Sequence, residues 1–213
     1  MTTAARAQAL AHKTSTPIEL ERRHGARNYD PLKVVLERGQ DVWLFDTAGR
    51  RYLDMMSAYS AVSFGHANPT LVQTLTEQAK TLAVTSRAFH TARLGSFLER
   101  LCRVTRMDRA LPMNTGAEAV ETAIKAARRW GHRVKGIAAD RARILVARNN
   151  FHGRTTTIVG FSSEPSYRDG FGPFAPGFVP FDFGDMASIE RAYTPDVCAV
   201  LVEPIQGEAG VVL

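Results

Sequence analysis

The chain has 213 residues, of which 45% are hydrophobic and 23% charged, a composition typical of a globular protein with a substantial core. Its net charge of +6 comes from 27 basic and 21 acidic residues. The arginines are scattered and are not interleaved with aromatic residues in a stacking pattern, which argues against a nucleic-acid partner. The longest apolar runs, such as 144–147 and 197–202, are far too short to cross a bilayer, so no membrane partner is expected.

The termini and the cysteines indicate the compartment. The first ten residues contain one arginine and no sustained apolar run, so we expect a short tail there instead of a signal peptide. The two cysteines, Cys102 and Cys198, each lie within an apolar stretch. We interpret them as buried free thiols, because a disulfide or metal framework needs more cysteines at closer spacing. A protein of the reducing cytoplasm is predicted.

The first predicted elements are a helix and a small β-meander. Thr16 followed by Pro17 is typical of a helix start. Three β-like runs follow, at 33–37, 41–45 and 51–55. Glycine-containing turns are predicted between them, at 38–40 and 47–49.

Helices and strands alternate in the rest of the chain. Helices are predicted at 68–83, 91–106, 114–131 and 185–192, and strands at 143–147, 157–161 and 197–202. This alternation favours a mostly parallel α/β sheet, with the boundary to the meander near residues 60–70. The last seven residues add no closing helix, so the sheet is expected to continue in another polypeptide.

The segment 114–119 is the first candidate binding site. Small residues at a helix start let backbone N–H groups approach a phosphate, and the helix dipole favours its negative charge. Taken alone, the same segment is more simply explained as a plain capped helix start, with Thr115 or Asn114 as the cap.

The segment Phe151-His152-Gly153-Arg154-Thr155 is the second candidate. It follows a predicted strand, where open α/β sheets place functional loops. An aromatic ring can stack on a planar cofactor, and an arginine can hold a carboxylate through two parallel hydrogen bonds. The alternative is a surface turn with a solvated arginine. No second ligand lies at metal spacing from His152, so no metal site is expected.

Acidic residues follow the last predicted strand. Glu203 and Glu208, with Gln206 between them, are well placed for a site at the carboxyl end of the sheet. Paired carboxylates also occur in glycoside hydrolases, but the sequence offers no matching aromatic platform for a sugar. The turn-rich, aromatic segment 166–178 is expected to be an ordered loop.

Together these segments resemble the pyridoxal-phosphate aminotransferases that include the ornithine, acetylornithine and 4-aminobutyrate enzymes. The motifs that carry the resemblance stand in order at 65–69, 114–119, 151–155 and 203–207. Segments that are similar to the ornithine enzymes in particular stand at 57–62, 111–116, 170–174 and 176–178. The similarity extends from about Tyr29 to Leu213.

The resemblance implies an α/β fold of the fold-type-I transferases that depend on pyridoxal phosphate, here incomplete. Residues 1–65 correspond to the N-terminal helix and β-meander of the small domain. Residues 66–213 correspond to the first part of the large cofactor-binding domain with its mixed or parallel sheet.

The resemblance also implies roles for residues of the cofactor site. Gly116 and Ala117 bind the cofactor phosphate through backbone N–H groups. Phe151 stacks on the pyridine ring, with His152 beside it. Arg154 binds the carboxylate of 2-oxoglutarate or glutamate.

The remaining implied contacts concern the amino donor. Glu208 pairs with Arg154 when ornithine is bound, and Tyr29 and Tyr59 contact the ornithine end. A histidine at position 152 is frequent in the acetylornithine branch, so acetylornithine aminotransferase stays open as an alternative enzyme.

Two implied residues have no counterpart in this sequence: a carboxylate for the pyridine nitrogen and the lysine that binds the cofactor covalently. None of the five lysines stands in the right context. We therefore assign no catalytic residue and expect this chain alone to be inactive. Conversion of ornithine and a 2-oxo acid to glutamate 5-semialdehyde and an amino acid is expected to need a separately encoded second half and the family's homodimer. The alternative is a non-catalytic remnant or interaction module.

Overall fold

The computed structural model describes residues 15–208 and 210–213, which form two compact units that meet between His90 and Thr91 in the chain. The tail expected over the first ten residues lies outside the described residues. The domain boundary expected at residue 65 concerns the complete family fold and stays a prediction. None of the helices among the described residues has the length and apolar character needed to cross a membrane.

The first unit contains a capped helix, a meander and two further helical segments. Its elements are α2 (Pro17–His24), β1 (Leu36–Gln40), β2 (Trp43–Asp46), β3 (Arg51–Leu53), α3 (Ser57–Ser60) and α4 (Pro69–Thr81). Thr16 and Glu19 form a reciprocal capping box at the start of α2, which confirms the predicted helix start. The three strands pair antiparallel in the order β1-β2-β3, so the predicted meander is also confirmed.

The prediction of a turn at 38–40 was wrong, because these residues belong to β1. The chain reverses at Asp41, which adopts a positive φ of 50°, and Gln40 pairs with Trp43 across the turn. Gly39 is small for a different reason: a Cβ at this position would lie 2.7 Å from the Cβ of His66. The glycine therefore permits a close approach of two segments and does not form the turn.

His66 fastens the segment after β3 to this hairpin. Its backbone exchanges two hydrogen bonds with Asp41, of 2.7 and 2.9 Å, and its Nε2 lies 2.7 Å from Oδ2 of Asp54. The motif 65–69, which contributes to the family resemblance, thus has a structural role within the first unit.

Asp46 is the polar centre of the meander and the one buried residue among residues 15–90. Its carboxylate accepts hydrogen bonds from the backbone N–H groups of Ala48 and Arg50, from the Arg50 side chain and from the Tyr52 hydroxyl. Burial alone raises the pKa of Asp46. The hydrogen bonds from Arg50, Tyr52 and Ala48 outweigh burial and lower this pKa from 3.8 to about 2.

We expect the stability of the first unit to depend on the charge of Asp46. Because its pKa is lower in the folded state, the carboxylate stabilises the fold above about pH 4, and this contribution is lost as the pH falls towards 2. Asp46→Asn removes the charge and should flatten the dependence of the melting temperature on pH in this range. Fluorescence of Trp43 in a Trp130→Phe background reports the first unit alone. The same slope in both proteins would contradict this role.

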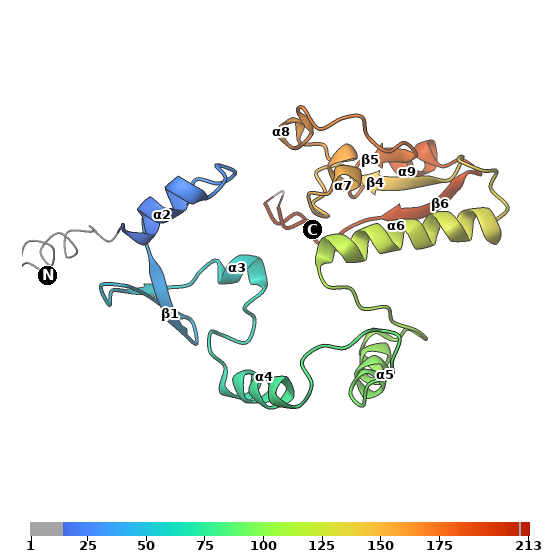
Figure 1. Cartoon of the computed structure of the whole chain (residues 1–213). Helices are drawn as coiled ribbons and strands as arrows, with labels where there is room; N and C mark the ends of the chain where they lie inside the picture. The colour runs from blue at the N-terminus through green and yellow to red at the C-terminus, as the bar shows by residue number, and fades with distance from the viewer. Residues whose placement is uncertain (1–14, 209) are drawn as a thin grey trace, which may run out of the picture. The chain divides into compact units, whose positions relative to one another are not determined.

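The second unit is built on a parallel sheet. Its elements are α5 (Leu94–Thr105), α6 (Gly116–Arg133), β4 (Arg143–Ala147), α7 (Thr156–Gly160), α8 (Pro165–Arg168), β5 (Phe178–Phe181), α9 (Met186–Ala192) and β6 (Val197–Leu201). The strand order is β5-β4-β6, with β4 parallel to both neighbours. The predicted parallel α/β arrangement is confirmed, and α6 runs along one side of the sheet (Figure 1).

Alternate residues of β4 serve two hydrophobic clusters, one on each face of the sheet. One cluster comprises Ile124, Ile144, Val146, Ile158 and Phe161, contributed by α6, β4, α7 and the residue that follows α7. The other comprises Leu145, Ala147, Phe181 and Val197, with Ile189 of α9 packed against it. The sheet is thus covered on both faces, as expected for parallel strands.

Two predictions for this unit were wrong. Residues 157–161 were predicted as a strand, but residues 156–160 form the short helix α7, which Thr155 caps by accepting a hydrogen bond from the Ile158 N–H. Both conformations bury Ile158 and Val159, so the apolar run did not distinguish them. The segment 166–178 was predicted as loop throughout; residues 169–177 are loop, but residues 166–168 belong to α8 and Phe178 begins β5. Pro180 obscured this edge strand.

Candidate functional site

The N-terminus of α6 offers the predicted anion-binding geometry. Thr115 caps the helix: its hydroxyl accepts the Glu118 N–H at 3.1 Å, and Glu118 in turn accepts the N–H groups of Asn114 and Thr115. The capping box uses three N–H groups and leaves those of Gly116 and Ala117. Within the described part of the chain, no group accepts a hydrogen bond from these two.

The space beside Gly116 is open. A Cβ at this position would meet no atom within 4 Å. Two N–H donors, the positive end of an 18-residue helix and free space together fit a phosphate group. The negative charge of Glu118 at the same end of the helix opposes the binding of a phosphate. Its Oε2, however, already accepts the two capping hydrogen bonds from Asn114 and Thr115.

The loop 151–155 packs against this helix start, 34 or more residues away in sequence. Gly153 has a φ of +127°, and a Cβ there would lie 3.2 Å from the Cβ of Ala117 and 3.1 Å from Cδ1 of Ile158. One turn further along α6, Glu121 accepts a hydrogen bond from the Thr155 hydroxyl. The two motifs predicted to bind the cofactor therefore form one surface.

Phe151 is held from the other side by the segment that follows β6. Its N–H donates to Oε2 of Glu203 at 3.2 Å. Its ring stands edge-on to that of Tyr167, with the centroids 6.4 Å apart. The loop is thus fixed at both ends, by α6 at Thr155 and by Glu203 at Phe151.

His152 is half-buried, and its Nε2 is buried without a hydrogen-bond partner among the described residues. Its ring lies 6.2 Å from that of Phe161. Burial lowers the pKa of His152, and the negative charge of Glu203 opposes this effect by raising it. The geometry favours a neutral imidazole near neutral pH.

We expect Glu203→Gln to lower the pKa of His152 further. The amide keeps an oxygen that can accept the Phe151 N–H, but it removes the charge that favours the imidazolium. The protonation of His152, followed by NMR of the ring protons, should move to lower pH. Glu190→Gln, an exposed change on α9, is the matched control and should leave the titration in place. An unchanged His152 titration in Glu203→Gln would contradict this electrostatic link.

Arg154 is exposed and makes loose contacts. Its guanidinium carbon lies 4.6 Å from the ring centroid of Tyr167 and 5.8 Å from that of Phe151, and its terminal nitrogen lies 3.5 Å from the Tyr167 hydroxyl. The ion pair expected between Arg154 and Glu208 is not formed among the residues that the structure describes. The guanidinium is therefore available to another carboxylate, and its pairing with Glu208 stays a prediction.

Tyr29 and Tyr59 belong to the first unit, where the structure brings them together. Their hydroxyl oxygens lie 3.1 Å apart, although 30 residues separate them in sequence. Tyr59 lies in α3, whose residues Ser57 to Ser60 all have positive φ angles of 47–68°, so this turn is left-handed. Both phenol rings are exposed, and their contact with a substrate stays a prediction.

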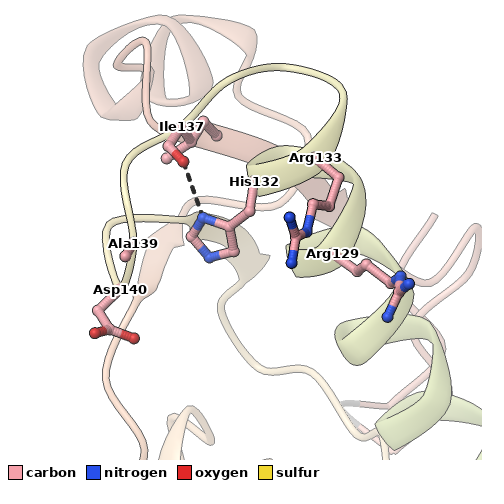
Figure 2. A pocket seen from close by; sticks show the side chains of 6 residues that line it. All are labelled: Arg129, His132, Arg133, Ile137, Ala139 and Asp140. Atoms are coloured by element: carbon pink, nitrogen blue, oxygen red, sulfur yellow. Dashed lines mark hydrogen bonds between the residues drawn. The ribbon is translucent and has the colours of Figure 1, made fainter.

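A hollow of about 410 Å³ lies at the opposite end of α6 and does not include any of the predicted site residues. Figure 2 shows its lining side chains, among them His132, whose Nδ1 lies 3.0 Å from the Ile137 carbonyl oxygen. Arg129 and Arg133 stand one helical turn apart beside it. The exposed arginines and the nearby Asp140 show the mixed charge of an ordinary protein surface.

From the sequence alone we assigned no role in this site to Glu121 or Tyr167, and we placed Glu203 and Gln206 near a site without identifying the residues that they contact. Gln206 is fully buried and donates to the Arg148 carbonyl oxygen at 2.7 Å, which ties the segment after β6 to the segment before Phe151. These contacts join positions 13 to 58 residues apart. The sequence hinted at these contacts only through the positions of the polar residues. Glu203 and Gln206 follow a predicted strand, and Glu121 lies on the predicted helix.

The sequence of this chain is similar to those of known proteins. Residues 24–213 match the aminotransferase class-III family. The ornithine aminotransferase of Bordetella pertussis (strain Tohama I) is 58% identical over 189 residues, which are 89% of this chain and 46% of that protein. The chain thus spans about half the length of the curated relatives it matches.

Solved structures share the fold. The ornithine aminotransferase of Toxoplasma gondii ME49 superposes with a TM-score of 0.90 at 37% identity, over 99% of this chain and 51% of that one. The same parasite's enzyme, crystallized with oxidized glutathione, has partial occupancy of PLP at its active site. The acetylornithine aminotransferase of Elizabethkingia anophelis gives a TM-score of 0.78 at 52% identity, over 91% of this chain and 47% of that one.

The expected fold class, the α/β fold of the fold-type-I transferases that depend on pyridoxal phosphate, is confirmed, and the chain holds part of that fold. Since the match to the family extends over residues 24–213, the chain belongs to the class-III aminotransferase family.

Proposed function

We propose that this chain forms the phosphate-binding and carboxylate-binding side of an ornithine aminotransferase that uses pyridoxal phosphate. The observation that carries the proposal is the packing of Gly153 against Ala117, which places the Arg154 loop beside the free N–H groups of the α6 N-terminus. The 58% identity to the Bordetella ornithine aminotransferase supports the choice of substrate.

The residues present fit the cofactor. The N–H groups of Gly116 and Ala117 hold its phosphate, and the Phe151 ring stacks on the pyridine, with the neutral His152 beside it. When bound, pyridoxal phosphate supplies the electron sink for transamination. The chain's own contribution is to orient that ring and to exclude water on the side of Phe151.

Arg154 gives the site a way to serve two substrates of different charge. Its guanidinium binds a carboxylate of 2-oxoglutarate or glutamate through paired hydrogen bonds. When ornithine is the donor, Glu208 pairs with Arg154, so that the δ-amino group is the one presented. Tyr29 and Tyr59 contact the ornithine end. A charge pair that opens for one substrate and closes for the other gives specificity by differential contacts.

We assign the lysine that binds the cofactor, and the carboxylate for the pyridine nitrogen, to a segment outside these 213 residues. Lys135 donates to the Val197 carbonyl oxygen at 2.6 Å, and Lys125 is exposed on α6. Lys33 and Lys80 belong to the first unit, and Lys13 lies outside the described residues. We therefore expect these 213 residues alone to be inactive, and activity to require a further segment of the family fold together with a second subunit.

The test is a search for a covalent cofactor adduct. The purified chain is incubated with pyridoxal phosphate, with and without the segment that corresponds to the other half of the family fold, and reduced with borohydride. Mass spectrometry should find an adduct on a lysine of the second segment, only when both are present. An adduct on a specific lysine of this chain would overturn the assignment. No adduct in either sample would favour a non-catalytic remnant or interaction module.

Acetylornithine aminotransferase is the second candidate enzyme. His152 and the 52% identity to the Elizabethkingia acetylornithine aminotransferase favour it. The combined enzyme decides the matter through the ratio of its kcat/KM values for ornithine and N-acetylornithine. A ratio above one supports the ornithine activity, and a ratio well below one supports the acetylated substrate.

A further inference from the structure

The loop that carries Arg154 is attached to α6 on either side of that residue. Gly153 packs on Ala117, and Thr155 donates its hydroxyl hydrogen to Glu121. Arg154 itself is exposed, and its guanidinium lies near the Tyr167 ring and hydroxyl and the Phe151 ring. Its position therefore depends on its two backbone neighbours more than on its own side-chain contacts.

The distance between the two attachment points on α6 matches the distance between the two attached residues of the loop. Ala117 and Glu121 are four residues apart, so they share one face of α6 and are separated by about 6 Å along the helix axis. Gly153 and Thr155 are two residues apart, and an extended chain covers about 6.6–7.2 Å in two residues. Two successive turns of the helix thus hold two alternate residues of the loop, and Arg154 lies between them.

The Thr155 hydroxyl makes a second hydrogen bond, in which its oxygen is the acceptor. It accepts the Ile158 N–H at 3.3 Å, while the Thr155 carbonyl oxygen accepts the Val159 N–H at 2.9 Å. Glu121 is half-buried, so its carboxylate takes this hydrogen bond in an environment where a charged acceptor holds a hydroxyl strongly. The hydroxyl orientation that caps α7 is the one in which its hydrogen points to Glu121.

We propose that Glu121 is a positioning residue for Arg154: through Thr155 it fixes the guanidinium at the place where the 2-oxo acid carboxylate binds. The inference rests on the proposed function for its consequence on the substrate, but not for the contact itself. Glu121 does not touch the substrate. It connects the helix that holds the cofactor phosphate to the residue that selects the acidic substrate.

The first experiment uses the 213-residue chain without cofactor. Amide hydrogen exchange of Ile158 and Val159 is measured by NMR in wild type, Glu121→Ala, Glu121→Gln, Thr155→Ser, Thr155→Val and the exposed control Glu190→Ala. We expect Glu121→Ala to exchange about ten-fold faster, as for loss of one charge-assisted hydrogen bond. Thr155→Val should exchange at least as fast, because it also removes the oxygen that accepts the Ile158 N–H. Glu121→Gln keeps an acceptor and Thr155→Ser keeps the hydroxyl, so both should resemble wild type. Glu190→Ala lies on α9, away from this contact, and should also resemble wild type.

The double variant Glu121→Ala/Thr155→Val should exchange no faster than Thr155→Val, because both changes remove the same contact. Wild-type exchange in Glu121→Ala would overturn the proposal whatever the function of the chain. So would additive effects in the double variant, since they would place Glu121 and Thr155 in separate interactions.

The second experiment uses the enzyme formed with the complementary segment. Glu121→Ala should raise the KM for the 2-oxo acid about ten-fold and change the KM for the amino donor less than about two-fold, with Glu121→Gln near wild type. Equal changes in both KM values would overturn the role in carboxylate binding. An inactive wild-type combination would count against the proposed function, whereas the exchange experiment would still decide on the contact.

Discussion

Arg154→Ala is expected to raise the KM for the 2-oxo acid by about two orders of magnitude in the transaminating enzyme. A bidentate pair between guanidinium and carboxylate contains two charge-assisted hydrogen bonds, and losing it costs about 3 kcal/mol. The guanidinium is exposed, so the alanine leaves no cavity and the fold should be unaffected. Initial rates at varied 2-oxo acid and fixed ornithine measure the effect.

Two further variants separate charge from geometry. Arg154→Lys keeps the positive charge but cannot form parallel hydrogen bonds, so we expect it to recover only part of the loss. Arg168→Ala is the matched control, because Arg168 is also exposed and also lies over an aromatic ring, that of Phe174 at 5.1 Å. A KM for ornithine that rises as much as that for the 2-oxo acid would show that Arg154 orients the cofactor and does not select a carboxylate.

The elements with local start signals were predictable from the sequence. Thr16 before Pro17 marks a helix start that the structure has at the same residue, and the helix predicted from Asn114 begins two residues later, at Gly116; each start has a capping box. Strand β4 spans the predicted residues 143–147, because a buried central strand is a continuous apolar run. Local chemistry determines these boundaries, so a single sequence is enough to find them.

The errors arose where a distant contact determines the local conformation. Gly39 resembles a turn residue, yet it stays in a strand because His66 packs against it. Residues 156–160 resemble a strand, yet the Thr155 cap and its bond to Glu121 favour one helical turn. His66 and Glu121 are both far in sequence from the segments that they contact. Periodicity and turn propensity, which depend on neighbouring residues, therefore could not predict these conformations.

In the candidate site, too, local segments could be predicted from the sequence and the contacts between them could not. The helix start at Gly116 and the Phe151–Thr155 loop were each recognisable, but only the family resemblance joined them. The side chains that hold the loop in place, Glu121 and Glu203, act through single hydrogen bonds to residues 34 and 52 positions away. Such contacts follow from the strand order β5-β4-β6, which a sequence of this length does not specify by itself.

Gly153→Ala is expected to lower the free energy of unfolding of the second unit by about 2–6 kcal/mol. A φ of +127° strains any residue with a Cβ by about 1–3 kcal/mol, and the added methyl meets Ala117 at 3.2 Å and Ile158 at 3.1 Å, which costs about 1–3 kcal/mol more. Urea unfolding followed by Trp130 fluorescence in a Trp43→Phe background measures the second unit alone. The loop should also leave α6, which removes the surface on which the phosphate and the carboxylate meet.

Gly95→Ala in α5 is the matched control for the same unit. A Cβ there meets nothing within 4 Å, and the backbone is helical, so alanine should be neutral or stabilise the helix by up to about 1 kcal/mol. The comparison separates the general effect of removing a glycine from the specific contact with Ala117. If Gly153→Ala unfolds at the same urea concentration as wild type, Gly153 does not lie against α6. The proposed function would then lose the observation that carries it, although the hydrogen bond from Thr155 to Glu121 would still connect the loop to α6.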